Sequence, residues 1–230
     1  MNLPELHQMA IAGDAAGIRS FIKQRGDVNE RARNGAAAIM YAAEKNHAHI
    51  VKLLIDAGAD PNITNKVGGT ALNRAAENGN IEMMHYLFDH GAVVGPLALI
   101  IAAREGQLEA VKLLLERGAE INARQSWGQT ALMQAAREGH TEVCSYLVRQ
   151  GADVSIKDKS GKSAIRLATD NDNPEITAYL RRAGAVEETE KKKSSAPAVN
   201  MDDDDDEDSD DKFPEASSGE DDELSEDRLD

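Results

Sequence analysis

The sequence predicts an all-α fold, a solenoid of repeated helix-turn-helix units. A motif with an opening glycine recurs at a nearly fixed interval, and its copies place the same residue types in the same roles. The opening glycines are Gly35, Gly68, Gly95, Gly128 and Gly161, at intervals of 33, 27, 33 and 33 residues. A period of this size is typical of arrays in which each unit covers only its neighbours. We therefore expect binding by an extended surface rather than chemistry in a pocket.

The first helix of each unit follows a capping residue and contains two alanines. Thr70, Thr130 and Ser163 stand where a hydroxyl can cap the first backbone donors of a helix. Paired alanines keep this helix thin, so neighbouring units can stack closely. The pairs are Ala42-Ala43, Ala75-Ala76, Ala102-Ala103 and Ala135-Ala136. The helix must then stop in a left-handed conformation, which glycine adopts at little cost. The residues at this stop are Gly79, Gly106, Gly139 and, in the second unit, Asn46.

The second helix of each unit carries a heavy apolar stripe with the three-and-four spacing of a helix. The clearest stripes are Ile50, Val51, Leu53 and Leu54; Val111, Leu113, Leu114 and Leu115; and Val143, Tyr146, Leu147 and Val148. The glycines that end these helices are Gly58, Gly91, Gly118, Gly151 and Gly184. A polar segment such as Asp60-Pro61-Asn62 then leads into the next unit.

These residues closely resemble the ankyrin repeat, which is a β-turn finger followed by two antiparallel helices. The resemblance covers about residues 3–186 and includes the Gly-x-Thr opening, the double alanine, Gly139-His140 and Gly58-Ala59-Asp60-Pro61-Asn62. One departure is systematic, because the family usually has Thr-Pro-Leu-His where this chain has Thr130-Ala131-Leu132-Met133. Loss of the proline leaves the helix start less pre-set, and the expected fold is unchanged.

The resemblance implies about six repeats in one array, residues 1–186, followed by a tail. The predicted units are residues 1–34 (N-terminal cap repeat), 35–67, 68–94, 95–127, 128–160 and 161–186 (C-terminal cap repeat). One interval is short, because only Val93-Val94 separates Gly91-Ala92 from Gly95-Pro96, and about six finger residues are missing. This gap in the finger row is either a tolerated loop deletion or a notch that admits part of a partner.

All of the net charge lies in the tail. Residues 1–186 contain 21 acidic and 21 basic residues, whereas residues 187–230 contain 20 acidic and 5 basic residues and carry the net charge of −15. Such a segment cannot bury enough apolar surface to order itself, so we expect disorder. Three roles remain open for the tail: a solubilising segment, an arm that binds a basic partner, or an intramolecular competitor for an acidic ligand.

The sequence offers no set of residues for catalysis. No phosphate-binding glycine loop, Cys/His metal spacing or nucleophile elbow occurs, so we expect no enzyme activity, no bound metal and no cofactor. The single cysteine, Cys144, lies in an apolar stripe and is interpreted as a small buried hydrophobe in a reducing compartment. We expect no secretory signal at the start of the chain, and no stretch approaches a membrane span. The expected location is the cytoplasm, or the nucleus in a eukaryote.

The resemblance implies a contact surface made of fingertip positions and the exposed edge of the first helices. These positions are Arg33, Asn34, Ala36, Glu44 and Lys45; Lys66, Val67, Gly69, Glu77 and Asn78; Arg104 and Glu105; Ser126, Trp127, Gln129, Arg137 and Glu138; and Lys159 and Lys162. Trp127 is the only tryptophan and stands on a finger, where it is either an anchor for a partner or a cover that packs on the neighbouring finger.

Three classes of function follow from these observations. The first is a protein-interaction adaptor or scaffold that acts as a monomer and uses this face, with the tail modulating binding. The second is a chaperone or inhibitor of a basic protein, such as a ribosomal protein, a histone or a nucleic-acid-binding protein. The third is a secreted bacterial effector with ankyrin repeats. Direct binding to nucleic acid or to a membrane is not expected, because phosphate groups need neutralising cations and the tail is strongly acidic.

Overall fold

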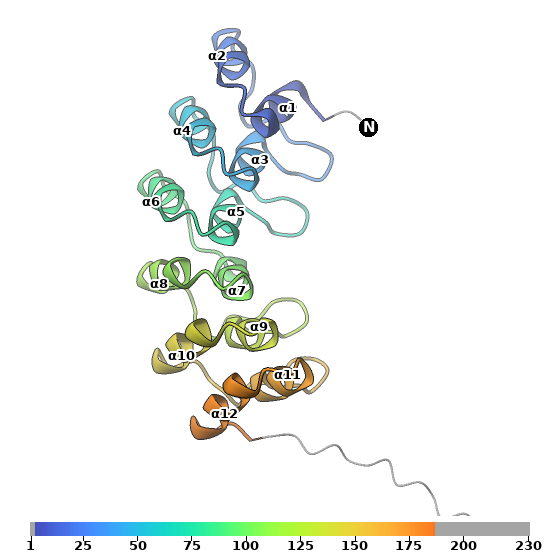
Figure 1. Ribbon diagram of the computed structural model, residues 1–230. Coiled ribbons are helices and arrows are strands. Elements are labelled where there is room, and N and C mark those ends of the chain that lie inside the picture. The colour runs from blue at the N-terminus through green and yellow to red at the C-terminus, as the bar shows by residue number, and fades with distance from the viewer. Residues whose placement is uncertain (1–2, 187–230) are drawn as a thin grey trace, which may run out of the picture. The chain divides into compact units, whose positions relative to one another are not determined.

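The computed structural model describes residues 3–186, which form twelve helices in six antiparallel pairs (Figure 1). The helices are α1 (Glu5–Ala12), α2 (Ala15–Lys23), α3 (Ala38–Glu44), α4 (Ala48–Asp56), α5 (Ala71–Glu77), α6 (Ile81–Asp89), α7 (Pro96–Arg104), α8 (Leu108–Glu116), α9 (Ala131–Glu138), α10 (Thr141–Arg149), α11 (Ala164–Asp170) and α12 (Pro174–Arg182). The prediction of an all-α repeat solenoid is confirmed. The acidic tail, for which disorder was predicted, lies outside the described residues.

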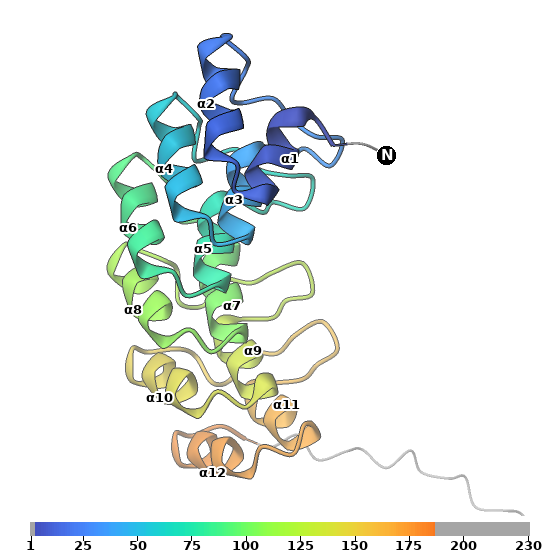
Figure 2. The same cartoon turned by 45° about the horizontal axis from the view of Figure 1, so that its top comes forward.

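The first helices (α1, α3, α5, α7, α9 and α11) stack in one column, and the second helices stack beside them (Figures 1 and 2). The alanine pairs lie at the contacts between successive first helices. In α7, Ala102 and Ala103 are completely buried, as are Ala75 and Ala76 in α5. Because each contributes only a methyl group, the backbones of neighbouring units approach closely, and the larger side chains of the second helices fill the remaining core.

The helix starts agree with the sequence at two of the three predicted caps. The Thr70 Oγ1 accepts from the Asn73 N–H at 3.2 Å, and the Thr130 Oγ1 accepts from the Met133 N–H at 3.3 Å. The cap predicted at Ser163 is wrong. Ser163 has the same extended backbone, but its Oγ is buried without a hydrogen-bond partner in the described structure. Serine lacks the branching methyl of threonine, so its side chain is held less firmly in the capping rotamer.

The shortened unit differs from the others at its opening glycine. Gly95 was predicted to be equivalent to Gly68, which has a φ of 77° and precedes its helix by three residues. Instead, Gly95 has a φ of −88° and is itself the N-cap of α7, which begins at the next residue. Pro96 explains the earlier start, because its ring presets the helical φ at the first position and no finger precedes it.

Polar side chains connect each repeat to the next. The Nε2 atom of His140 donates to the Arg104 carbonyl at 2.8 Å, and Gln107 donates to the Glu77 carbonyl at 3.2 Å. These acceptors are last-turn carbonyls of the preceding first helix, which have no partner inside the helix. Asn62 completes a similar link, because its side chain accepts from Val93 N–H at 2.9 Å in the next unit. The repeats are therefore joined by hydrogen bonds as well as by apolar contact.

We predict that Ala102→Leu destabilises the array by about 1–3 kcal/mol, because it adds bulk where α7 packs between α5 and α9. Chemical denaturation followed by circular dichroism measures this change. The matched control is Ala178→Leu on the exposed side of α12, which should leave the denaturation midpoint nearly unchanged. Equal midpoints for wild type and Ala102→Leu would contradict the close stacking of the first helices.

Candidate protein-binding surface

Four β-turn fingers project from the column of first helices, all on the same side (Figure 1). We name them finger I (residues 30–36), finger II (63–69), finger III (123–129) and finger IV (156–162). The same two backbone hydrogen bonds close each turn. In finger II, the Asn65 N–H donates to the Gly69 carbonyl and the Gly68 N–H donates to the Asn65 carbonyl, each at 3.0 Å. The glycine at the fourth position of the turn, Gly68 in this finger, supplies the positive φ that the turn requires.

The fingers form two bonded pairs with a gap between them. The Lys66 N–H of finger II donates to the Asn34 carbonyl of finger I at 2.9 Å, and the Lys159 N–H of finger IV donates to the Trp127 carbonyl of finger III at 3.0 Å. Figures 1 and 2 both show fingers II and III separated beside α7, from which no finger projects. The finger that the sequence lacks is therefore absent from the middle of the row.

The fingertips expose two large apolar side chains. Trp127 is 69% exposed at the tip of finger III, and Val67 is 78% exposed at the equivalent position of finger II. The carbonyl of Trp127 is bonded to the neighbouring finger, while most of its side chain is exposed. This exposure favours the anchor role over the cover role, and both stay predictions.

The charge of the fingers is predominantly positive. The four segments contain seven basic residues and two acidic residues. Lys66, Ser126 and Lys159 lie exposed at the tips. Lys162, at the base of finger IV, instead donates to Asp170 at 2.7 Å and holds the pKa of that carboxyl below its usual value. Exposed cations therefore stand both at the tips of the fingers (Lys66, Lys159) and at their bases (Arg124, Lys157).

The ends of the first helices carry a chain of ion pairs that runs across three repeats. Arg74, which was not among the predicted contact residues, lies between Glu44 of one repeat and Glu77 of its own. The distances are 4.0 Å for Lys45 to Glu44, 3.7 Å for Arg74 to Glu44, 2.7 Å for Arg74 to Glu77, 3.4 Å for Arg104 to Glu77 and 2.7 Å for Arg104 to Glu105. The carboxylates and cations balance, and exposed pairs of this kind contribute at most about 1 kcal/mol each. This edge thus presents an ordered pattern of charge with no net charge.

The remaining predicted contact residues divide into exposed and internally bonded ones. Arg137 and Glu138 form an exposed ion pair at 3.4 Å at the end of α9. Asn78 is exposed, but its side chain donates to the carbonyl of Ala43 at 2.9 Å, so it links two repeats. Gln129 is half-buried, and its side chain accepts hydrogen bonds from two neighbouring glutamines. The side chains of Asn78 and Gln129 thus form hydrogen bonds within the array.

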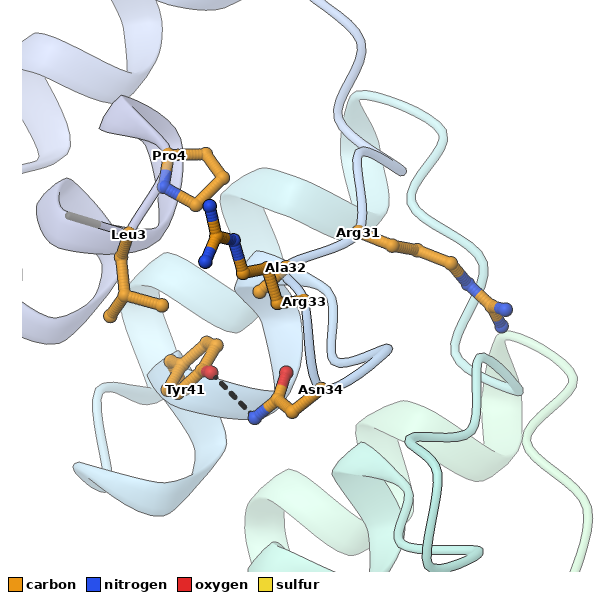
Figure 3. Close-up of a pocket in the computed structure, with 7 residues that line it drawn as sticks. All are labelled: Leu3, Pro4, Arg31, Ala32, Arg33, Asn34 and Tyr41. Carbon is orange, nitrogen blue, oxygen red and sulfur yellow. Dashed lines mark hydrogen bonds between the residues drawn. The ribbon is translucent and has the colours of Figure 1, made fainter. Parts of the chain in front are cut away.

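A pocket of about 350 Å³ lies between finger I, α3 and the N-terminal segment (Figure 3). Apolar atoms come from Leu3, Pro4 and the ring of Tyr41. The Tyr41 hydroxyl accepts from the Asn34 side-chain amide at 3.0 Å. Arg33 extends toward Pro4, whereas the side chain of Arg31 points away from the other lining residues (Figure 3). Two predicted contact residues, Arg33 and Asn34, therefore line a partly apolar hollow at one end of the finger row.

Residues 3–186 lack metal-ligand clusters and membrane-spanning helices. No group of three or more His, Cys, Asp or Glu side chains in that range could hold a metal ion. No helix in that range is long and apolar enough to cross a membrane. Cys144 is buried in the core, as the sequence predicted, and burial raises the pKa of its thiol to about 12.

Comparison with known proteins supports the repeat assignment made from these residues. The sequence profile of ankyrin repeats, which describes three copies, matches residues 6–98 and 99–191. The chain belongs to the ankyrin repeat family. A crystal structure of an ankyrin repeat domain from Acinetobacter baumannii is 28% identical, with a TM-score of 0.66, and the alignment covers 79% of this chain and 98% of that one.

Curated relatives share only part of their length with this chain. Human NAD-capped RNA hydrolase NUDT12 is 31% identical over 124 residues, which are 54% of this chain and 27% of NUDT12. The match covers only the ankyrin part of that enzyme. Cyclin-dependent kinase inhibitor 2A from Monodelphis domestica is 33% identical over 95 residues, which are 38% of this chain and 55% of the inhibitor. Ankyrin repeats generally mediate binding to proteins and are typically not enzymes.

We predict that Cys144 does not react with a thiol reagent in the native protein at pH 8. Its pKa of about 12 leaves almost no thiolate at that pH, and the surrounding core blocks access. The same reagent should modify one thiol per chain in denaturant, which serves as the control. Rapid labelling of the folded protein would show that α10 is not packed as described.

Proposed function

We propose that this chain is a non-enzymatic adaptor or scaffold that binds a protein partner through its fingers and the exposed ends of its first helices. The observation that carries the proposal is the character of the fingertips. They combine exposed Trp127 and Val67 with a seven-to-two excess of basic residues, next to a charge-balanced helix edge. Aromatic and cationic side chains on an ordered surface are the usual anchors of protein interfaces.

We further propose that the acidic tail modulates this binding by charge. Residues 187–230 carry the entire net charge of −15, opposite in sign to the fingers. Charge of this size changes association rates and the choice of partner more than it changes raw affinity. An acidic partner would compete with the tail for the fingers, whereas a basic partner would be attracted by the tail.

A second candidate function is that of a chaperone or inhibitor of a basic protein. It is favoured by the 20 acidic residues of the tail, which could neutralise such a protein while the array grips it. The two functions differ in the sign of the partner's charge, so one comparison separates them.

The proposal is tested by affinity capture with the full chain and with residues 1–186, followed by mass spectrometry and measurement of the Kd of the captured partner. Removal of the tail should tighten binding to an acidic partner. Removal should weaken binding to a basic partner, mainly by slowing association. The direction of the change therefore assigns the role of the tail.

We predict that Trp127→Ala weakens the complex by roughly tenfold or more, because an exposed aromatic anchor typically contributes over about 1.4 kcal/mol. The matched control is Val186→Ala, an 81% exposed apolar residue beyond the last helix, which should bind like wild type. Circular dichroism should be unchanged for both. A partner whose affinity survives both Trp127→Ala and tail removal would rule out the finger face as the binding element.

A further inference from the structure

The row of fingers is interrupted between fingers II and III. Within residues 3–186, this interruption leaves one backbone C=O and one backbone N–H without a hydrogen-bond partner. In each bonded pair, the tip carbonyl of one finger accepts from the tip N–H of the next, as Asn34 accepts from Lys66 at 2.9 Å. Val67 stands 33 residues after Asn34, and Ser126 stands 33 residues before Lys159. The Val67 carbonyl and the Ser126 N–H are therefore the equivalent groups that face the gap. Neither has a hydrogen bond within residues 3–186.

One repeat of the stack, which contains α7, separates these two groups. α7 packs against both α5 and α9, so the stacking of repeats continues through the unit that lacks a finger. Where a following finger exists, it lies directly against the tip glycine. A Cβ on Gly128 would lie 3.3 Å from the Lys159 nitrogen, whereas a Cβ on Gly68 would meet only the Leu97 Cδ1, at 3.6 Å. Finger II thus faces the first turn of α7 rather than another backbone.

The side chains around this opening are apolar and cationic. Val67 and Trp127, the exposed tip residues of fingers II and III, belong to the two fingers that border it. Pro96 is exposed and Leu97 half-buried in the first turn of α7. Fingers II and III contain Lys66 and Arg124 and no acidic residue. A complementary ligand therefore has an apolar side chain, nearby carboxylates and a backbone that can both donate and accept.

We propose that this opening, named here the finger gap (between fingers II and III and above the first turn of α7), receives an extended segment of a protein partner. The segment takes the place of the absent finger. Its N–H donates to the Val67 carbonyl, and its C=O accepts from the Ser126 N–H. A large apolar side chain contacts Trp127 and Val67, and flanking Asp or Glu residues lie near Lys66 and Arg124. The inference rests on the proposed function and specifies what the fingers recognise.

An extended protein segment fits the Val67 carbonyl and the Ser126 N–H because its main chain carries both an N–H donor and a C=O acceptor at a fixed spacing. Peptides that add to exposed backbone edges gain affinity from such hydrogen bonds and specificity from alternate side chains. Phosphate groups of a nucleic acid would match the two cations but would supply no N–H for the Val67 carbonyl and no partner for the exposed valine.

The test uses phage-displayed random twelve-residue peptides selected against the full chain, with binding followed by the fluorescence of Trp127, the single tryptophan. Selected peptides should share a large apolar residue flanked by Asp or Glu. The decisive variant inserts six finger residues between Val93 and Val94, which restores a finger and fills the gap. Circular dichroism and thermal unfolding verify that it folds.

The insertion variant should bind the selected peptides at least about tenfold more weakly than wild type, and Trp127→Ala should do the same, as measured with a dye on the peptide. Val186→Ala is the control for loss of an exposed apolar group and should match wild type. If the insertion variant does not fold, Val67→Asp supplies the second variant. It removes the apolar wall, adds a repelling carboxylate and should also weaken binding.

Other outcomes overturn the inference in distinguishable ways. Peptides that lose affinity with Trp127→Ala but bind the insertion variant and Val67→Asp like wild type would use the finger face without the gap, so the proposed function would stand alone. Peptides insensitive to all of these changes would contradict both. Dimers of the wild-type chain that the insertion variant cannot form would make a second copy the occupant. Binding seen only after residues 187–230 are removed would assign the gap to that segment.

Discussion

The close approach of the first helices is the constraint on which the rest of the array depends. Alanine pairs such as Ala102-Ala103 are completely buried between neighbouring helices, so the backbones of successive repeats are separated by little more than methyl groups. This spacing lets His140 and Gln107 reach carbonyls of the preceding repeat. It also brings successive fingertips close enough for a direct N–H to C=O bond. The packing of the core thus determines the geometry of the surface.

The deletion of one finger acts on the surface and leaves the core intact. Because the helices carry the stacking, α7 remains packed between α5 and α9 while its finger is missing. The result is a row of two bonded finger pairs. On either side of α7, the Val67 carbonyl and the Ser126 N–H have no hydrogen bond within residues 3–186. Surface loops tolerate such changes, and here the exposed tip residues Val67 and Trp127 belong to the two fingers on either side of α7. Recognition at the finger gap would therefore depend on regular stacking of the helices beneath an irregular row of fingers.

Much of the fold could be read from local chemistry. The left-handed stops and the caps at Thr70 and Thr130 follow from residue type and position alone. The start of α7 could not be predicted from the 27-residue interval, because spacing does not reveal that Pro96 makes Gly95 an N-cap. The ion pair of Arg74 with Glu44 was missed because the two residues are 30 positions apart and their contact depends on repeat register. The exposure of Trp127 likewise depends on which way the fingertip side chain points.

Amide hydrogen exchange, measured residue by residue by NMR on the full chain, tests the arrangement of the fingers most directly. Lys66, Lys159 and Ser126 occupy the same fingertip position, but only the first two donate to a neighbouring finger. We predict slow exchange at Lys66 and Lys159 and much faster exchange at Ser126. Equal protection of all three amides would show that the finger gap is already closed, and equally fast exchange would show that the fingers are not paired.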